Sequence, residues 1–254
     1  MQSDKYSLQN KVAIVTGASK GIGEAIALHL ADCGAQVVVS SRKMDDIEKV
    51  AEKIRKERGK AIALACNASY PEQCKNLIDK TIEHFGGVDI LVNNAATNPV
   101  YGPALECSAE LFDKLINVNV RGPFELAKLA YPSMKSLGGG SVINISSIAG
   151  DTPDEGLGIY SVTKAALNML TKVLAREWGI DGIRVNAIAP GLIKTKFSAA
   201  LWKDEKIYNA ILERIPSGRM GTVDEIAELA VFLASDASSY STGSVFTADG
   251  GWTI

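Results

Sequence analysis

Tyr160 and Lys164 are the two residues of this sequence best suited to acid–base chemistry. They lie four positions apart in a stretch with a helical pattern, so the phenol and the ammonium share one face, one turn apart. A tyrosine with an ordinary pKa of about 10 is a poor acid or base at neutral pH, but an adjacent cation favours the phenolate and lowers the tyrosine pKa. The pair could therefore exchange a proton with a carbonyl or an alcohol. The same spacing is also common on solvated helices.

Ser147 is the residue that could complete this pair. It follows Ser141 to Ile145 (SVINI), which we predict to be a buried strand. Parallel sheets present ligands at the carboxyl ends of their strands, and a hydroxyl there could hold a substrate oxygen against the tyrosine. Ser146 is the competing candidate, but the alternation of side chains along a strand turns it to the other side.

A glycine-rich turn, Lys11 to Gly23 (KVAIVTGASKGIG), indicates a phosphate-binding site. Its apolar run predicts a buried strand, and Gly17, Gly21 and Gly23 allow a sharp turn and close approach of a ligand to the backbone. The helix that follows points free N–H groups and its positive dipole end over this turn. A dinucleotide pyrophosphate is the expected ligand, although such a turn can also be only a tight connection.

The remaining pattern alternates strands with helices and predicts an α/β fold. Predicted strands are Val12 to Val15, Gln36 to Ser40, Ala61 to Ala65, Val88 to Val92, Ser141 to Ile145, Arg184 to Ile188 and Ser244 to Ala248. Predicted helices are Gly21 to Cys33, Asp45 to Arg58, Pro71 to Phe85, Ser108 to Lys135 with a bend at Gly122-Pro123, Ile159 to Trp178 and Val223 to Leu233. We expect a single doubly wound Rossmann-type domain over residues 1–254, with a parallel sheet of about seven strands covered by helices on both faces and a substrate lid at about 190–219.

Taken together, these motifs resemble the short-chain dehydrogenase/reductase family over essentially the whole chain. The resemblance rests on the Thr-Gly-x-x-x-Gly-x-Gly turn, Asn93-Asn94-Ala95, Ser147, Tyr160 and Lys164, in order and at the family spacing. Two positions depart from the family pattern. The motif Asn-Asn-Ala-Gly ends in Ala96, and the usual Asp-Val after the third strand reads Asn67-Ala68, where the asparagine could still bond the adenine amino group. We expect modest effects on cofactor affinity and none on the reaction type.

The resemblance implies a role for each catalytic position. Asn119 would hold a water in a proton relay with Lys164, and Ser147 would orient and polarise the carbonyl. Tyr160 would transfer the proton, and Lys164 would lower the tyrosine pKa and bind the nicotinamide ribose. The enoyl reductases of this family space tyrosine and lysine more widely, so reduction of carbon–carbon double bonds is disfavoured.

The end of the second predicted strand favours NADP(H) over NAD(H). NAD-specific folds place a carboxylate there for the ribose 2′-hydroxyl, whereas this chain has Ser40-Ser41-Arg42-Lys43, with Lys20 in the glycine turn. Arg42 could form a fork on a 2′-phosphate and Lys20 could add a point charge, unless the cations only face solvent. The cofactor-binding residues implied are Gly17, Ser19, Lys20, Gly21, Ile22, Gly23, Ser41, Arg42, Asn67, Ala68, Asn94, Ala95, Ala96, Tyr160, Lys164, Pro190, Gly191, Ile193 and Thr195.

The substrate region is less specific. Asn98-Pro99 and the lid stretch Leu192 to Trp202 are similar to tetrameric NADPH-dependent carbonyl reductases, and Phe197, Leu201 and Trp202 could form an apolar pocket wall or be ordinary packing. An apolar or aromatic ketone or aldehyde is the first choice. A 3-oxoacyl thioester and a sugar or polyol are the alternatives, and a catalytically silent cofactor-binding subunit is the non-enzyme alternative. The resemblance also suggests a homotetramer.

Composition excludes several other functions. A net charge of −2 and a pI near 5.8 give little support to nucleic-acid binding. No apolar run is long enough to span a membrane and the first residues are polar, so we expect a cytoplasmic protein. Four scattered cysteines and two histidines favour reduced thiols over a disulfide frame or a metal site. We therefore expect no metal and no catalytic histidine.

Overall fold

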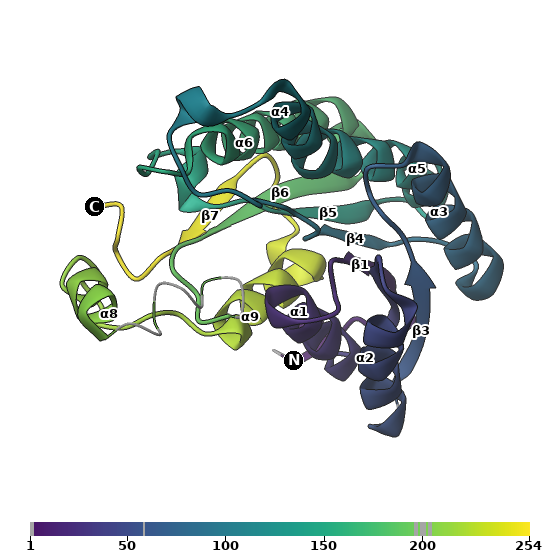
Figure 1. Cartoon of the computed structure of the whole chain (residues 1–254). Helices are drawn as coiled ribbons and strands as arrows, with labels where there is room; N and C mark the ends of the chain where they lie inside the picture. The colour runs from purple at the N-terminus through teal and green to yellow at the C-terminus, as the bar shows by residue number, and fades with distance from the viewer. Residues whose placement is uncertain (1–2, 58, 196–197, 199–201, 203–204) are drawn as a thin grey trace.

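A computed structural model describes residues 3–57, 59–195, 198, 202 and 205–254 of the chain. Seven strands in this part form one sheet in the order β3-β2-β1-β4-β5-β6-β7, and every neighbouring pair is parallel (Figure 1). The strands are β1 Val12–Thr16, β2 Gln36–Ser41, β3 Lys60–Ala65, β4 Ile90–Asn93, β5 Gly140–Ile145, β6 Ile183–Pro190 and β7 Val245–Ala248. The predicted doubly wound α/β fold is confirmed.

Helices cover both faces of this sheet (Figure 1). One layer holds α1 Gly21–Asp32, α2 Met44–Lys56 and α9 Val223–Ala234; the other holds α3 Pro71–Phe85, α4 Ala109–Ile116, α5 Gly122–Ser136 and α6 Gly158–Trp178. The short helix α8 Glu205–Leu212 lies apart from both layers. Because both faces are covered, β1 is buried at every position, as expected for the inner strand of a parallel sheet.

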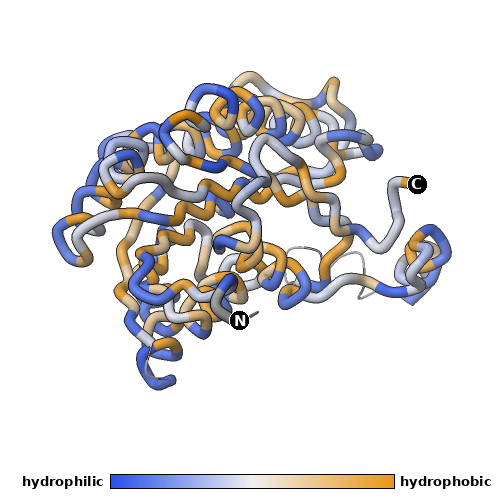
Figure 2. The backbone as a smooth tube through the Cα atoms, turned by 180° about the vertical axis from the view of Figure 1, so that it is seen from behind, coloured by the Kyte–Doolittle hydropathy of each residue, from blue (hydrophilic) through white to orange (hydrophobic). Residues whose placement is uncertain are grey.

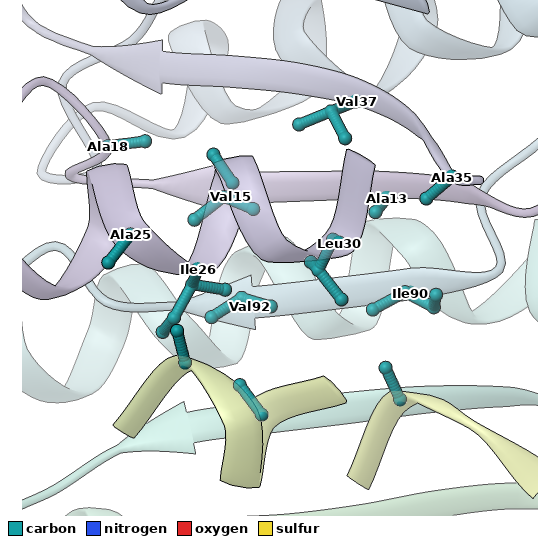
Figure 3. Close-up of a cluster of buried hydrophobic side chains, with 14 of the residues drawn as sticks. Ala13, Val15, Ala18, Ala25, Ile26, Leu30, Ala35, Val37, Ile90 and Val92 are labelled. Atoms are coloured by element: carbon teal, nitrogen blue, oxygen red, sulfur yellow. The ribbon is translucent and has the colours of Figure 1, made fainter. Parts of the chain in front are cut away.

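The core consists of two apolar clusters, one on each face of the sheet. Successive residues of a strand enter opposite clusters: Ala13 and Val15 pack under α1, whereas Ile14 faces the α3 and α5 layer. Figure 3 shows Ile26 and Leu30 of α1 beside β1 and β4. In Figure 2, hydrophobic residues concentrate along the strands and hydrophilic ones on the outer helices.

The strand order places a topological switch between β1 and β4. The chain winds outward from β1 through β2 to β3, then crosses to β4 on the other side of β1. Loops that leave the carboxyl ends of β1 and β4 therefore turn to opposite faces and leave a crevice between them, which is where open α/β sheets bind ligands. The glycine turn follows β1 and Asn94 follows β4, so both lie at this crevice.

The helix predicted from Ser108 to Lys135 differs from the structure. The helix α4 ends at Ile116, a π-helical turn occupies Asn117–Arg121, and α5 begins at Gly122. The Gly122 N–H donates to the Asn117 carbonyl, five residues back. Pro123 has no N–H, so it cannot supply the ordinary α-helical bond to the carbonyl of Asn119. In place of the predicted bend at Gly122-Pro123, the backbone hydrogen bonds change from the α-helical to the π-helical pattern in the turn before these residues.

Candidate active site

Ser147 lies just beyond β5, at the carboxyl edge of the sheet. Its hydroxyl accepts a hydrogen bond from the Ala149 N–H at 3.1 Å, which fixes the short turn that follows. Ser146 is buried, and its hydroxyl donates to the Lys164 carbonyl at 3.4 Å. Ser146 is therefore bound to the backbone of α6, whereas Ser147 lies beside the phenol of Tyr160.

Tyr160 and Lys164 lie on the first two turns of α6. The Lys164 Nζ is 5.5 Å from the centroid of the Tyr160 ring. The lysine is only 2% exposed, and its ammonium donates to the Ile145 carbonyl at 2.8 Å. A Cβ on Gly150 would come within 2.8 Å of the Lys164 carbonyl carbon, so the turn after β5 packs directly on α6. This close packing brings Ser147, Tyr160 and Lys164 together.

Burial shifts the two titrating groups in opposite directions. Loss of water around the phenol raises the pKa of Tyr160 to about 12, and the neighbouring Ser147 hydroxyl lowers it by less. Burial lowers the pKa of Lys164 to about 7, because the ammonium loses its water and no carboxylate among the described residues pairs with it. The predicted lowering of the tyrosine pKa is therefore wrong for this structure: burial raises the pKa of the phenol, and the lysine beside it is itself desolvated.

Asn119 lies in the π-helical turn and is buried. Its Oδ1 accepts from the Thr97 N–H at 2.8 Å, and its Nδ2 donates to the Thr97 carbonyl at 2.9 Å and to Thr163 Oγ1 at 3.1 Å. The side chain is thus occupied by protein partners. Its carbonyl oxygen, which cannot accept from Pro123, is the group better able to bind a water.

The glycine turn forms a cradle between β1 and α1. Gly17 and Gly21 have φ of +63°, a conformation that favours glycine. A Cβ on Gly23 would lie 2.6 Å from the Gly17 carbonyl oxygen. No side chain among the described residues caps α1, so its first N–H groups point at the cradle, where an anion could accept them.

The loop after β4 holds this cradle in place. The Asn94 Nδ2 donates to the carbonyls of Thr16 and Gly17 at 2.9 and 3.0 Å. The Thr16 hydroxyl accepts from the N–H groups of Asn94 and Ala95 at 3.0 and 3.1 Å. The Asn94 side chain therefore joins the two sides of the crevice. Ala96 next to it is exposed.

The segment after β6 reaches the glycine turn. Pro190 ends β6, Gly191 packs on Asp249, and Ile193 pairs with Gly221 in an isolated bridge. A Cβ on Gly21 would lie 3.6 Å from Thr195 Cγ2, in ordinary contact. The predicted cofactor residues of the glycine turn and of the 190s therefore meet in the structure.

The predicted adenosine side is made by the ends of β2 and β3. Arg42 and Lys20 are exposed, and neither side chain forms a hydrogen bond or an ion pair with any residue that the structure describes. Asn67 Oδ1 accepts from the Ser69 N–H at 3.1 Å, and Ala68 packs against Gly122. Ser19, Ile22 and Ser41 are partly buried beside them.

Two of the predicted substrate residues can be placed in detail. Asn98 is partly buried in the loop after β4. Trp202 donates through its Nε1 to the Thr195 carbonyl at 3.1 Å, with the Lys194 Nζ 5.2 Å from the ring centroid. Trp202 is therefore anchored beside the predicted cofactor segment. Phe197 and Leu201 lie outside the described residues.

Comparisons with known proteins identify the family of this chain. A family model described as Enoyl-(Acyl carrier protein) reductase matches residues 17–253. The protein named Dehydrogenase/reductase SDR family member 4 from Oryctolagus cuniculus is 42% identical over 244 residues, covering 96% of this chain and 94% of that relative. The chain belongs to the short-chain dehydrogenase/reductase family.

Two solved dehydrogenase structures have the same fold as this chain. A gluconate 5-dehydrogenase from Burkholderia cenocepacia J2315, in complex with NADP and tartrate, has a TM-score of 0.95 and 33% identity, with 100% of this chain and 99% of that chain covered. A 7α-hydroxysteroid dehydrogenase complexed with NADH and 7-oxo glycochenodeoxycholic acid has a TM-score of 0.95 and 35% identity, covering 99% and 97%. The present chain is an oxidoreductase of the kind that acts on CH–OH groups.

Three threonines of this short-chain dehydrogenase/reductase were not anticipated as site residues. Thr16 and Thr97 bind Asn94 and Asn119, and Thr163 links Asn119 to α6. Only Thr163 carried a signal in the sequence, because a threonine within a helix needs a backbone partner for its hydroxyl; Thr16 ends a strand, and Thr97 bonds Asn119 through its backbone. In the described part of the chain, no helix is long and apolar enough to cross a membrane, and no cluster of His, Cys, Asp and Glu could hold a metal ion.

Proposed function

We propose that this chain is an NADP(H)-dependent carbonyl reductase that interconverts a ketone or aldehyde with its alcohol, with Tyr160 as the general acid and base. The observation that carries the proposal is the convergence of Tyr160, Ser147 and Lys164 at the carboxyl end of β5. Hydroxyl and phenol groups side by side can hold one substrate oxygen from two directions, which is what proton transfer to a carbonyl requires.

The residues present fit a nicotinamide dinucleotide. Relatives of this fold were solved with NADP or NADH. The backbone cradle of Gly17 to Gly23 suits a pyrophosphate. Lys164 is buried, yet the only acceptor for its ammonium among the described residues is the Ile145 carbonyl, so N–H donors remain for ribose hydroxyls. When bound, the cofactor would supply the hydride.

Each catalytic residue then has a distinct task. Ser147 donates a hydrogen bond to the carbonyl oxygen and orients it, and Tyr160 donates the proton to that oxygen. Protonated Lys164 stabilises the phenolate that remains, because an adjacent cation favours the charged form. Asn119 holds the Thr97 loop with its side chain and offers its carbonyl oxygen to a water that returns the proton.

Two exposed cations support a preference for NADP(H) over NAD(H). Arg42 follows β2, Lys20 is the N-cap residue of α1, and no carboxylate occupies the sequence from Ser40 to Lys43. A guanidinium fork and an ammonium are the groups that bind a phosphate ester. A steady-state preference for NADH of more than about tenfold, which corresponds to about 1.4 kcal/mol, would contradict this assignment.

An apolar rim favours an apolar or aromatic carbonyl. Val100, Tyr101 and Leu105 are 50%, 72% and 97% exposed. Their loop packs on the segment just before Tyr160, because the Gly102 N–H donates to the Gly156 carbonyl at 3.0 Å. Apolar side chains at the mouth of a site bury apolar substrate surface. A 3-oxoacyl thioester and a sugar or polyol are the alternative substrates. Tyr160 and Lys164 are only four residues apart, and this spacing disfavours reduction of carbon–carbon double bonds.

The test is a screen of NADPH consumption with the wild-type protein and Tyr160→Phe. Substrates are apolar and aromatic ketones, dicarbonyls, acetoacetyl thioesters and keto sugars, and NADPH binding is measured by fluorescence. Tyr131→Phe is the matched control, since the Tyr131 hydroxyl bonds Asp181 at 2.6 Å and not the site. We expect Tyr160→Phe alone to lose nearly all turnover while it still binds NADPH. Full activity in Tyr160→Phe, or NADPH binding without turnover of any substrate by the wild type, would contradict the proposal.

A homotetramer is part of the proposal. The outer layer of α4, α5 and α6 exposes large apolar side chains that an assembly could cover: Phe112, Phe124, Val162, Met169 and Val173. Sedimentation as a monomer would contradict it.

The cytoplasmic location and the single domain with a lid at about 190–219 stay predictions.

A further inference from the structure

A single buried hydroxyl joins three parts of the candidate active site. Thr163 is 0% exposed and lies between Tyr160 and Lys164 on α6. Its Oγ1 donates to the Tyr160 carbonyl at 2.7 Å and accepts from Asn119 Nδ2 at 3.1 Å. The same Asn119 Nδ2 also donates to the Thr97 carbonyl at 2.9 Å. The backbone of the tyrosine is thereby connected to the π-helical turn and to the loop after β4.

These contacts fix the position of the tyrosine relative to the substrate side. Thr97 immediately precedes Asn98, on the loop whose later residues form the apolar rim. Threonine is β-branched, so its side-chain rotamer is restricted. This restriction helps to keep the hydroxyl in place between the Tyr160 carbonyl and Asn119 Nδ2. The hydroxyl has one proton to donate and gives it to the Tyr160 carbonyl, which leaves its lone pairs for the asparagine. The Tyr160 carbonyl, the Thr163 hydroxyl and the Asn119 amide therefore each have a hydrogen-bond partner within this set.

We propose that Thr163 is a positioning residue that sets the placement of the Tyr160 phenol against the substrate carbonyl. This inference rests on the proposed carbonyl reductase function. The threonine does not touch the reacting atoms. It acts through the backbone of the first turn of α6 and through Asn119, and small misplacements of a proton donor are costly in rate.

Thr171 provides a matched comparison on the same helix. It is also 0% exposed; its Oγ1 donates to the Leu167 carbonyl at 2.9 Å and accepts from Asn144 Nδ2 at 2.8 Å. The two threonines therefore make the same pair of bonds, one donated to the helix backbone and one accepted from a buried asparagine. They differ in place, because Thr171 lies about two turns further along α6 than Thr163.

The experiment compares Thr163→Val, Thr163→Ser and Thr171→Val with the wild type. Valine keeps the shape and removes the hydroxyl, whereas serine keeps the hydroxyl. We expect Thr163→Val to lower kcat for a carbonyl substrate by about 10- to 100-fold, with the NADPH dissociation constant changed by less than about threefold. Thr163→Ser should recover most of the rate, and Thr171→Val should keep kcat within about threefold of the wild type despite a similar loss in urea stability.

Hydrogen exchange gives a readout that does not depend on turnover. Amides of Thr97, Asn98 and the first turn of α6 should exchange faster in Thr163→Val and not in Thr171→Val, because local opening follows the loss of local bonds. If the wild type reduces no carbonyl, the proposed function fails, and this exchange pattern still decides the positioning role. If Thr163→Val does not fold, Thr163→Ala and Thr171→Ala replace the valine pair.

Two results would overturn the inference. Equal losses of kcat in Thr163→Val and Thr171→Val would show that the threonines only stabilise α6. Wild-type kcat in Thr163→Val, or unchanged exchange at Thr97 and the start of α6, would show that the hydroxyl does not position Tyr160.

Discussion

Replacing Lys164 by methionine should stabilise the ligand-free protein at neutral pH while it abolishes the proposed activity. The lysine is 2% exposed, and burial is the one cause of its lowered pKa. Methionine has a similar length, fills the same apolar surroundings and carries no charge to desolvate. The substitution therefore removes an energetic cost of the folded state that the wild type retains for function.

The pKa shift gives the size and the sign of the effect. The pKa of Lys164 falls from 10.5 to about 7 on folding, so between these values the unfolded chain binds more protons than the folded one. Stability of the wild type must then rise with pH across this window, and the penalty is largest below it. The whole shift corresponds to about 5 kcal/mol, and loss of the bond to Ile145 offsets about 1 kcal/mol of the gain. We expect a net gain of about 3 kcal/mol at pH 7, or roughly 6–10 °C in Tm.

The assay is thermal unfolding of wild type and Lys164→Met without ligand, from about pH 6 to about pH 10, the window in which the lysine titrates in either state. Lys172→Met is the control, because Lys172 is an exposed lysine on the same helix. The stability gap should be widest at the acidic end of this range and should close as the pH approaches the pKa of a free lysine, while the control shows no such trend. The reasoning is refuted if Lys164→Met is less stable than the wild type at pH 7, or if the gap does not depend on pH.

Three further predictions concern the cofactor cradle and the proton. Gly23→Ala should weaken NADPH binding and lower urea stability by a few kcal/mol, because the new methyl meets the Gly17 carbonyl oxygen and the Asn94 amide; unchanged binding would count against the cradle. Arg42→Ala should raise the KM for NADPH about tenfold and leave that for NADH nearly unchanged, since only NADPH carries the 2′-phosphate; equal changes would remove Arg42 from that role. Reduction uses the protonated phenol of Tyr160 and the protonated ammonium of Lys164, and burial raises the first pKa to about 12 and lowers the second to about 7, so kcat/KM for NADPH, which reports the free enzyme, should fall as the pH rises from about 6 to 9, whereas oxidation, which needs the phenolate, should not fall with it; initial rates in both directions check this.

Much of the fold could be predicted from the sequence because its signals are local. The run Val12 to Val15 is apolar at every position and ends at a glycine, and Pro71 at the first position of α3 marks where that helix begins. The π-helical turn at Asn117–Arg121 could not be predicted in this way. Gly122-Pro123 indicates that the helix is disturbed, but the contacts that the turn makes through the Asn119 side chain are with Thr97 and Thr163, which are distant in sequence.

The candidate site, like the fold, could be predicted only in part from the sequence. Spacing alone places Tyr160 above Lys164 on one helix face, and the strand end places Ser147 near them. The sequence does not say how much water remains around these groups, which is a property of the turn packed on α6 through Gly150. For this reason the predicted direction of the tyrosine pKa was wrong while the juxtaposition of the groups was right.

The two opposite pKa shifts have one physical origin. Burial penalises whichever form carries charge, so it holds the phenol of Tyr160 protonated and makes the ammonium of Lys164 easier to lose. Neither cost is repaid inside the described protein: the lysine has one carbonyl acceptor and the tyrosine one neighbouring hydroxyl. A ligand that brought hydroxyl acceptors to the lysine would restore its charge, and the restored charge would in turn stabilise the phenolate. The lowering of the tyrosine pKa expected from the sequence would then be a property of the ligand-bound enzyme, and the packing that opposes it in the free protein would make proton transfer depend on a filled site.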